Sequence, residues 1–238
     1  MATNKPEEKL IEALQKRHDP EAERLKRFLA MPDLSRTPGN PLEDLARRIV
    51  SLPRFSEFKN LNVPEIVSYD ISFALFNFPV DHPARKPSDT YFVDKDHGLR
   101  THTTVMWYYH LAGSEVRDKI KKGEPVGALS HGKVYRKDEI DRQHMNVFHQ
   151  MDGWYLCRKE DHVITIDDLR EVLAEIARAI FGKDIKYRFN TDEFPYTDPS
   201  TEMEIQVADR WVEVLGAGVV RESVLKNPRL IEAFRKVD

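Results

Sequence analysis

The stretch from Gly132 to Gly153, GKVYRKDEIDRQHMNVFHQMDG, constrains the fold of this chain more than any other. It divides into two β-prone segments joined by a polar loop, within predicted strands at residues 125–138 and 147–157. Because side chains two apart on a strand point to the same face of a sheet, the stretch predicts a hairpin whose two faces differ in polarity.

Four polar side chains are predicted to share faces of this hairpin. Arg136 and Asp138 are two apart on the first strand, and Gln150 and Asp152 are two apart on the second. The residues of the same parity are apolar: Val134, Ile140, Phe148 and Trp154. Charged groups on an apolar face are costly unless they are paired. The partners are either internal salt bridges or a charged ligand.

Length and composition place limits on the class of protein. A chain of 238 residues with 40% hydrophobic and 32% charged residues suits one globular domain, or a domain with an arm. The net charge of −3 gives no global basic field for nucleic acid. One cysteine, Cys157, and no long apolar run or signal core lead us to expect a cytoplasmic protein without a membrane segment.

The first 38 residues are predicted to form a short helical arm. Apolar residues recur at spacings of three and four within 7–18 and again within 20–30, which predicts two amphipathic helices. The segment MPDLSRTPGNP then has the composition of a linker. The arm could pack onto a partner chain, or it could be a solvated helical hairpin.

Residues 39–238 are predicted to form one α+β core, a mostly antiparallel sheet flanked by helices. The predicted helices cover 41–52 and 167–181, where apolar residues recur at helical spacing. The predicted strands are 61–67, 90–94, 125–138, 147–157, 185–191, 202–208 and 210–216.

The hairpin segments carry a family resemblance. The runs VYRKDEID and HMNVFHQMDG resemble motif 2 of class II aminoacyl-tRNA synthetases, in the form found in phenylalanyl-tRNA synthetase alpha subunits. One position departs, because that family usually has Glu where this chain has Asp152. The resemblance implies the class II synthetase fold and a ligase that joins phenylalanine to tRNA with ATP and Mg²⁺.

The segment LRTHTT resembles the family's LRTHTS, placed before a helix. The resemblance implies that His102 and Thr104 hold the carboxylate and ammonium ends of the amino acid. Threonines at a helix start also satisfy free backbone N–H groups, so capping is the alternative role for Thr101 and Thr103.

The segment FPYTDPS resembles the family's FPFTEPS. Phe194 and Tyr196 match the two aromatic residues that form the walls of the phenylalanine pocket. Tyr196 departs from the usual Phe, and its hydroxyl could point out of the pocket or fill it.

A half-buried strand follows, with Glu202, Glu204 and Gln206 on one face. This polar face could meet solvent or form the floor of a nucleotide site. The next run, WVEVLGAGVV, is similar to the family's WxEVLGxGMV, in which the acid lies near the nucleotide and its magnesium. Glu202 and Glu213 are therefore the predicted Mg²⁺ ligands.

The reaction implied is attack of the amino-acid carboxylate on the α-phosphate of ATP. A carboxylate is ionised at pH 7 and needs no general base, so alignment and charge neutralisation are the main requirements. Arg136 is the predicted catalytic residue, because its guanidinium grips phosphate oxygens. Gln150 and Asp152 would anchor the substrate ammonium. Further ATP contacts are assigned to Asp138, Phe148 and Glu213, and to His144 in the 142–146 loop.

The resemblance also implies partners. It extends to a motif 1 region that includes FNFPVDHPAR, and motif 1 builds a subunit interface in class II enzymes. Homodimerisation through this region, a beta-type synthetase subunit and tRNA(Phe) are expected. Phe73, Phe76 and Phe78 could serve that interface or the core.

Three interpretations remain open for the C-terminal part. The resemblance runs from Asn40 to about Asn227, and the chain ends at PRLIEAFRKVD, before the position expected for the glycine-rich motif 3 with its ATP-binding arginine. The chain could be a shortened copy, the other part could come from a second polypeptide, or the chain could be a paralogue without ATP chemistry.

Two other classes of function stay open on the sequence. One is a non-catalytic binding or regulatory module derived from the synthetase. The other is a metal hydrolase built on His102, His144 and His149, whose spacing matches no common zinc motif.

Overall fold

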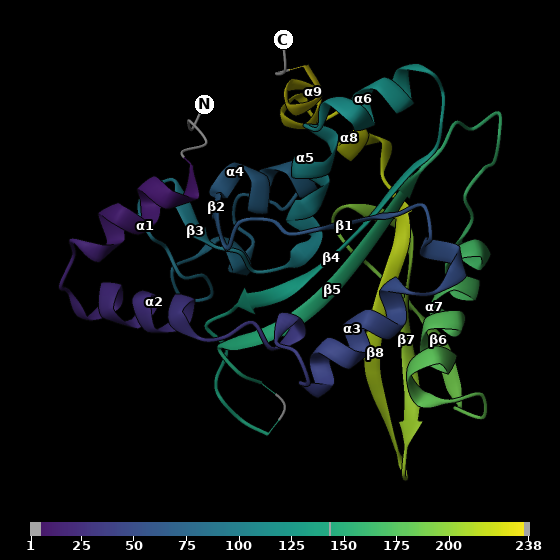
Figure 1. Ribbon diagram of the computed structural model, residues 1–238, viewed down its shortest axis with the longest axis horizontal. Coiled ribbons are helices and arrows are strands. Elements are labelled where there is room, and N and C mark those ends of the chain that lie inside the picture. The colour runs from purple at the N-terminus through teal and green to yellow at the C-terminus, as the bar shows by residue number, and fades with distance from the viewer. Residues whose placement is uncertain (1–5, 143, 236–238) are drawn as a thin grey trace.

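A long antiparallel hairpin forms the centre of the fold (Figure 1). The computed structural model of the protein describes residues 6–142 and 144–235. Strands β4 (Val126–Tyr135) and β5 (Val147–Leu156) pair along their full lengths, and β1 (Lys59–Leu61) joins β4 in parallel. The predicted hairpin is confirmed, although β4 ends one residue before Arg136.

A second three-stranded antiparallel sheet contains β6 (Tyr187–Asp192), β7 (Thr197–Val207) and β8 (Arg210–Val220). Its middle strand alternates as expected, with Met203 and Ile205 buried while Glu202 and Glu204 are half-buried. The register of β7 and β8 shifts between Met203 and Glu204, so Glu204 pairs with Glu213 and Glu202 pairs with Gly216.

A third, two-stranded sheet pairs β2 (Ile66–Ser68) with β3 (His97–Leu99). Two predicted boundaries are wrong here. The predicted strand 61–67 is two short strands, β1 and β2, interrupted by a segment that contains Pro64, which lacks a backbone N–H. The predicted strand 90–94 contributes only one isolated bridge, from Phe92 to Gly98.

Helix α7 (Ile166–Phe181) packs against both larger sheets. It begins with a capping box in which Thr165 and Asp168 exchange hydrogen bonds with each other's backbone. Leu173 packs in a cluster with Met203 of the β6–β8 sheet, and Val172 packs in a cluster with Leu129 of β4. This one helix therefore fixes the two sheets relative to each other.

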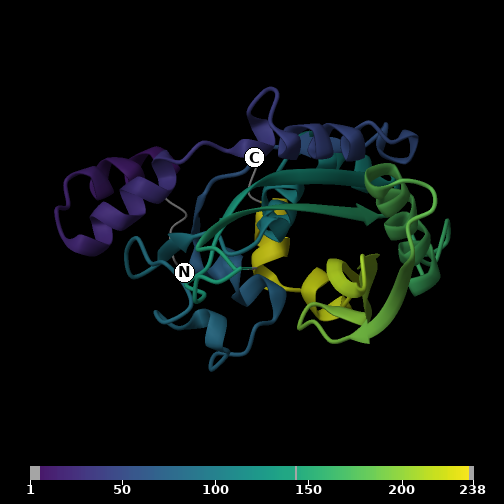
Figure 2. The same ribbon diagram turned by 90° about the horizontal axis from the view of Figure 1, so that it is seen from below.

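Helices cover both faces of the β4–β5 hairpin (Figure 2). Helix α3 (Pro41–Val50) and the short η2 (Pro53–Phe55) lie on one face, where Ile49 and Phe55 contact Leu129. The other face meets the largest core cluster. The helices on that side are α4 (Tyr69–Ser72), α5 (Met106–Leu111), α6 (Ser114–Lys121), α8 (Glu222–Leu225) and α9 (Pro228–Arg235). Short 3₁₀ turns complete the fold: η1 (Leu34–Arg36), η3 (Ala74–Phe76), η4 (Pro83–Arg85) and η5 (Thr103–Val105).

The two helices of the arm, α1 (Glu7–Gln15) and α2 (Pro20–Ala30), are present as predicted. Their apolar faces are buried against the chain's own core, where Leu10, Leu14 and Leu25 pack with Ile66 and Tyr135. Neither a partner chain nor solvent therefore takes up these apolar residues, and the arm is part of the packed structure.

A buried lysine anchors the end of the arm. Lys133 of β4 is 2% exposed, and its Nζ donates to the carbonyl oxygens of Phe28, Leu29 and Met31 at 3.3, 3.0 and 2.7 Å. A cation at a helix C-terminus satisfies free carbonyls and complements the helix dipole. The Nζ of Lys133 also forms an ion pair with the Glu65 carboxylate, at 3.2 Å.

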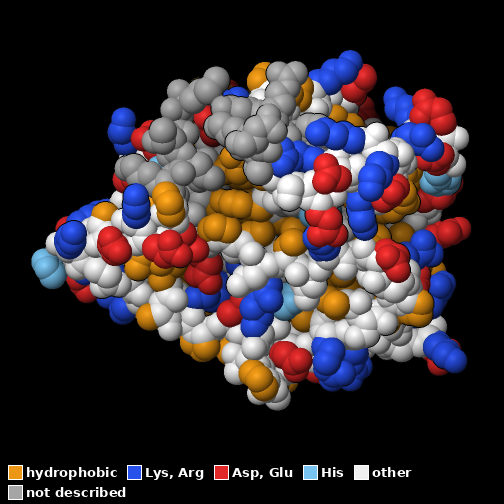
Figure 3. Space-filling view, turned by 45° about the horizontal axis from the view of Figure 1, so that its top comes forward, with side chains coloured by type: hydrophobic (Ala, Val, Ile, Leu, Met, Phe, Trp, Pro, Cys, Tyr) orange, Lys and Arg blue, Asp and Glu red, His pale blue; other side chains and the backbone are white. Residues whose placement is uncertain are grey.

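The predicted α+β class with mostly antiparallel strands and flanking helices is confirmed. None of the described helices has the length and apolar character needed to span a membrane. Lysine, arginine, aspartate and glutamate side chains are interspersed over the face in Figure 3, in keeping with the small net charge.

Candidate functional site

Arg136 follows directly after β4 and extends its ladder by one bond, from its backbone N–H to the carbonyl oxygen of Asn146 at 3.1 Å. Its Nε donates to the carbonyl oxygen of Thr101 at 3.1 Å, and its guanidinium carbon lies 5.2 Å from the ring centre of Phe148. Burial lowers the pKa of Arg136, while Asp138 opposes that shift. The guanidinium stays charged and keeps its terminal nitrogens for a ligand.

Asp152 is the buried carboxylate of the site. It lies opposite Ser130 in the β4–β5 ladder, and its Oδ2 accepts a hydrogen bond of 2.5 Å from Thr104 Oγ1. Burial raises the pKa of Asp152 to about 6, against the lowering effect of the Thr104 hydrogen bond. This bond brings the LRTHTT segment beside the second hairpin strand.

Gln150 and Phe148 share the face of Asp152 by strand alternation. Gln150 lies opposite Gly132 and Phe148 lies opposite Val134. Gly132 has a φ of +152°, and an added Cβ there would lie 2.4 Å from a guanidinium nitrogen of the buried Arg100. A side chain at position 132 would therefore clash, and glycine allows the buried Arg100 guanidinium to approach the strand closely.

His102 has one ring nitrogen without a partner. Its Nε2 lies 2.9 Å from the carbonyl oxygen of Ser72 and so carries the proton, which leaves Nδ1 as a buried acceptor with no hydrogen bond. Burial lowers the pKa of His102 to about 4, so the ring is neutral at pH 7. A neutral imidazole with a free acceptor suits an ammonium group better than a carboxylate.

Phe194 and Tyr196 lie in the turn between β6 and β7, with their rings nearly parallel at 15° and 5.9 Å between centres. The ring of Phe194 covers Gly216, where an added Cβ would lie 3.0 Å from Phe194 Cζ. Burial and then Asp152 raise the pKa of the Tyr196 hydroxyl, while Arg136 lowers it. Tyr196, Asp152 and Arg136 are therefore close enough for their charges to interact.

The polar face of the β6–β8 sheet carries the two predicted metal ligands. Glu202 accepts a hydrogen bond of 2.9 Å from Asn190 Nδ2. The pKa of Glu213 is raised by burial and by the nearby carboxylates of Glu202, Asp192 and Glu204. Within residues 6–142 and 144–235, no group of three or more His, Cys, Asp or Glu side chains could hold a metal ion.

Two predicted ATP contacts lie at the rim. Asp138 is exposed and comes after the end of β4, so its placement on that strand is wrong. His144 is 55% exposed, and both its backbone N–H and its Nδ1 meet Asp141 within the loop. No contact joins His144 to Arg136 in the described part of the chain, and residue 143 of the predicted loop lies outside that part.

The histidines do not form a metal centre. His149 lies on the opposite face of β5 from Asp152, where its Nε2 accepts from the backbone of Leu34 at 2.9 Å and lies 3.4 Å from Asp33. His102 is buried in the aromatic cluster, and His144 is in the exposed loop. The metal-hydrolase interpretation therefore has no support among the described residues.

Several residues around the site were not predicted from the sequence. Ser130 is fully buried with a hydroxyl that has no partner, opposite Asp152. Trp107 stacks on Trp154 at 5.7 Å and contacts Tyr196 edge to face at 6.3 Å. The parity of Trp154 with Asp152 was a usable signal, but nothing in the sequence pattern places Trp107 beside it.

The core interpretation holds for Phe73 and Phe76, which are 1% and 0% exposed. Two of these rings also border the site: that of Phe76 lies 5.3 Å from His102 and 5.6 Å from Tyr196, and that of the half-buried Phe78 lies 6.2 Å from both. The segment that resembles motif 1 therefore supplies part of the aromatic surround of the site.

A mostly antiparallel α+β core, with a half-buried guanidinium and carboxylate on one hairpin and an aromatic pair on the next sheet, defines the catalytic core of a class II aminoacyl-tRNA synthetase. The family model of tRNA synthetases class II core domain (F) matches residues 29–234, and the chain belongs to that family.

The curated relatives narrow the resemblance to phenylalanine--tRNA ligase alpha subunits, as the sequence predicted. The subunit from Coxiella burnetii (strain RSA 493 / Nine Mile phase I) is 34% identical over 190 residues, which are 79% of this chain and 54% of the relative. The subunit from Caldicellulosiruptor bescii is 35% identical over 176 residues, 69% of this chain and 48% of the relative. That from Malacoplasma penetrans is 32% identical over 201 residues, 79% and 56% of the two chains.

The chain thus spans about half the length of the curated relatives it matches. Among solved structures, a pyrrolysyl-tRNA synthetase from Desulfitobacterium hafniense, PylSc, is similar with a TM-score of 0.51. The identity is 14%, and the match covers 81% of this chain and 62% of that one. At this identity the similarity concerns the fold alone.

Proposed function

We propose that this chain binds phenylalanine and ATP, forms the aminoacyl-adenylate with release of pyrophosphate, and provides the aminoacyl group for transfer to tRNA(Phe). The observation that carries the proposal is the buried Thr104–Asp152 hydrogen bond beside Tyr196, on the same hairpin face that ends at Arg136. The carboxylate of Asp152 suits the substrate ammonium, and the guanidinium of Arg136 suits a phosphate. The ring of Tyr196 suits the phenyl ring.

The ammonium end is assigned to Asp152, Gln150 and His102. An ammonium has three donors, and these side chains offer a carboxylate, an amide oxygen and the free Nδ1 acceptor. The hydrogen bond from Thr104 holds the Asp152 carboxylate in place and keeps the pKa of Asp152 from rising further. Phe194 and Tyr196 supply the surface for the phenyl ring.

Arg136 is assigned to the α-phosphate, where negative charge accumulates during attack. Its contacts with Thr101 and Phe148 hold the guanidinium in one position before the ligand arrives. A preorganised donor stabilises a transition state without reorganisation at the moment of reaction. Asp138 and His144, at the rim, are assigned to the outer part of the nucleotide.

The carboxylates of Glu202 and Glu213 fit Mg²⁺, because this ion is commonly held by one or two carboxylates together with substrate phosphates. When bound, Mg²⁺ would neutralise phosphate charge. Burial raises the pKa of Glu213 most, and the like charges of Glu202, Asp192 and Glu204 raise it further; a bound cation would relieve that repulsion.

We further propose a beta-type subunit and tRNA(Phe) as partners, in keeping with the relatives' name. The family resemblance of the motif 1 region supports a second alpha copy as a further partner, and we propose that the chain acts in the cytoplasm. Phe73 and Phe76 are unavailable for such an interface, because they are buried within the chain. Val80, Asp81 and Pro83, beside and within η4, are exposed and form an accessible part of that region.

Phenylalanine-dependent ATP–pyrophosphate exchange tests the activity, measured for the chain alone and with a beta-type subunit. Exchange in either case supports the ligase. Phenylalanine binding without exchange in both cases would favour the alternative, a binding or regulatory module. Failure to bind phenylalanine in both cases would contradict the assignment of the site.

A further inference from the structure

Ser130 is a single polar residue on an otherwise apolar face of β4. The face is made by alternate residues of the strand, and its other members are Val126, Ala128, Gly132 and Val134. Ser130 is 0% exposed, and its hydroxyl has no hydrogen-bond partner among the described residues. An alanine would suit this face equally well, so packing alone does not explain the hydroxyl.

A buried hydroxyl without a partner is unfavourable, because it has lost its hydrogen bonds to water and gained none in exchange. Three other buried serines, Ser35, Ser68 and Ser200, each have a partner for the hydroxyl oxygen. An exception in a folded protein calls for an explanation, and a role at a binding or reacting site is one of the known explanations. The surroundings of Ser130 indicate which role this is.

Ser130 lies directly opposite Asp152 in the β4–β5 ladder, so both side chains point to the site face. Residues directly opposite in antiparallel strands have Cβ atoms about 4.5–5.5 Å apart. The hydroxyl oxygen is one bond from the Cβ of Ser130, and each carboxylate oxygen is two bonds from the Cβ of Asp152. Rotation about these bonds can bring the two groups within hydrogen-bond distance. Asp152 is therefore an acceptor within reach of the Ser130 hydroxyl.

The Asp152 carboxylate can accept a further donor. Its Oδ2 accepts from Thr104, and the carboxylate also accepts from the backbone N–H of Gly153. An ionised carboxylate offers about four acceptor positions on its two oxygens. The hydroxyl of Ser130 and the ammonium of an amino acid can therefore be accommodated together.

The charged and titratable groups around Asp152 do not neutralise its carboxylate. The Tyr196 hydroxyl, whose pKa is raised by burial and then by Asp152, faces it from the turn between β6 and β7. Arg136, at the end of the hairpin face, is held by Thr101 and Phe148 instead. In the described part of the chain, no Lys, Arg or His lies within ion-pair distance of Asp152. Uncharged donors therefore set its position before a ligand binds.

We propose that Ser130 is a positioning residue for Asp152, the carboxylate assigned above to the substrate ammonium. In the complex with an amino acid, the Ser130 hydroxyl donates to Oδ1 of Asp152 while Thr104 holds Oδ2. The ligand excludes water from this face, which strengthens a hydrogen bond to the charged carboxylate. The inference rests on the proposed function, and Ser130 lies outside the segments that carry the family resemblance.

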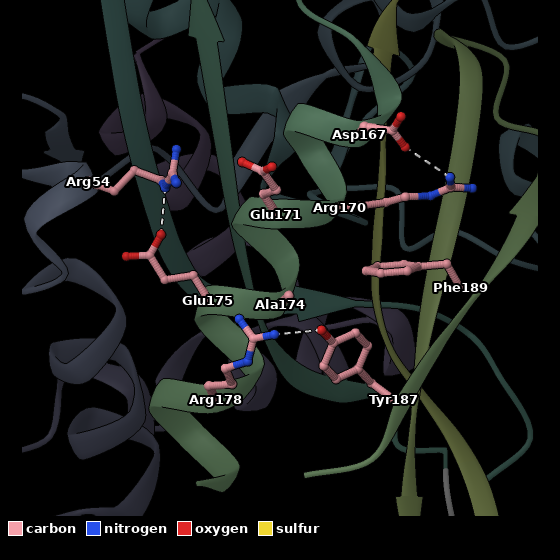
Figure 4. Close-up of a pocket in the computed structure, with 9 residues that line it drawn as sticks. All are labelled: Arg54, Asp167, Arg170, Glu171, Ala174, Glu175, Arg178, Tyr187 and Phe189. Carbon is pink, nitrogen blue, oxygen red and sulfur yellow. Dashed lines mark hydrogen bonds and ion pairs between the residues drawn. The ribbon is translucent and has the colours of Figure 1, made fainter. Parts of the chain in front are cut away.

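A hollow of about 580 Å³ beside α7 offers no comparable group (Figure 4). Three guanidinium groups in its wall have side-chain partners: Arg54 pairs with Glu175 at 2.6 Å, Arg170 with Asp167 at 3.2 Å, and Arg178 with the Tyr187 hydroxyl at 2.7 Å. These groups are therefore paired within the chain itself, in contrast to the hydroxyl of Ser130.

Ser130→Ala separates a positioning role from a structural one. Because it removes a hydroxyl that has no partner, the melting temperature of the ligand-free variant should equal or exceed that of the wild type. Its phenylalanine affinity at pH 8, measured by isothermal titration calorimetry, should nevertheless fall about tenfold or more, as expected for a lost hydrogen bond to a charged group.

Ser35→Ala is the matched control. Its hydroxyl already bonds to Asp33 at 2.6 Å and to His131, whose side chain is on the other face of the hairpin. This variant should lower the melting temperature and leave the phenylalanine affinity unchanged.

A double-mutant cycle with Asp152→Asn tests whether Ser130 acts through Asp152. Ser130→Ala should cost much less affinity in the Asp152→Asn background, because the charged acceptor is absent there. Carboxyl ¹³C NMR provides a second readout. Phenylalanine should lower the pKa of Asp152 from its value of about 6 in the free protein, and Ser130→Ala should reduce that decrease while leaving the free value in place.

Equal phenylalanine affinities of Ser130→Ala and the wild type would overturn the inference and leave the proposed function intact. Equal losses of affinity in the two Asp152 backgrounds would also overturn it, as would a melting temperature that falls for Ser130→Ala as it does for Ser35→Ala. Failure of the wild type to bind phenylalanine is a different result, because it would contradict the proposed function and this inference together.

Discussion

Thr104 donates a hydrogen bond of 2.5 Å from its Oγ1 to Oδ2 of Asp152, a residue 48 positions later in the chain. The bond joins the start of the α5 region to the middle of β5. The Asp152 carboxylate also accepts a hydrogen bond from the backbone N–H of Gly153, and Phe148, Gln150 and Trp154 share its face of the strand. A buried carboxylate of this kind is costly unless a cation completes it.

Asp152→Asn is expected to weaken phenylalanine binding by about 10-fold to more than 100-fold. A hydrogen bond to a charged group contributes about 1.5–3 kcal/mol, and the amide removes the charge at nearly constant shape. Isothermal titration with phenylalanine measures the change, with Glu193→Gln as a control on an exposed carboxylate near the site turn. Equal affinity of Asp152→Asn and the wild type would contradict the assignment of the ammonium site.

Phenylalanine affinity is expected to fall as the pH is lowered through about 6. The pKa of Asp152 is raised to about 6 by burial, so protonation removes the anionic partner below that pH. Because the Thr104 hydrogen bond lowers this pKa, Thr104→Val should move the midpoint of the profile to higher pH, while Thr104→Ser should leave it in place. Titration calorimetry between pH 5 and 7 measures the phenylalanine affinity at each pH. An affinity that does not change over this range in the wild type would exclude Asp152 as the titrating group.

Gly216→Ala is expected to weaken phenylalanine binding more than ATP binding. The added Cβ would lie 3.0 Å from Phe194 Cζ and would push the ring out of its position, at a cost of about 1–3 kcal/mol. Gly113→Ala is a matched control, since its Cβ would lie 3.2 Å from a backbone oxygen far from the aromatic pair. If both variants bind phenylalanine like the wild type, Gly216 does not set the position of the wall.

Lys133→Met is expected to destabilise the protein by about 3–5 kcal/mol, because it leaves buried carbonyls of α2 and the Glu65 carboxylate without their cation. Urea unfolding measures the effect, and hydrogen exchange should show faster exchange in residues 7–30. The exposed Lys183→Met should change stability by less than about 0.5 kcal/mol. A small effect of Lys133→Met would mean that packing alone holds the arm.

The sequence predicts the central hairpin and most of the site face well, for a physical reason. Strand alternation places Gln150 and Asp152 on the same face of a strand, independently of the rest of the fold. Helical spacing of apolar residues likewise predicts α7 and α3 from local sequence alone. The family resemblance then brings Thr104 and Tyr196 to that face, which local pattern cannot do.

Long-range packing explains what the sequence did not predict. The docking of the arm through Lys133 depends on contacts between segments far apart in the chain. Trp107 joins the site through tertiary packing alone. Ser130 differs, because it shares the parity of Arg136 and strand alternation places it on the site face. Asp138 and His144 lie beyond the regular ladder, where the period of two no longer predicts direction.

Calorimetric titration with a non-hydrolysable phenylalanyl-adenylate analogue is the most direct test of the central claim, that one site holds both halves of the adenylate. The wild-type chain is expected to bind the analogue far more tightly than phenylalanine alone, since both Asp152 and Arg136 contribute. Asp152→Asn and Arg136→Gln should each remove most of that gain. Failure of the wild type to bind, or equal binding by all three proteins, would contradict the account.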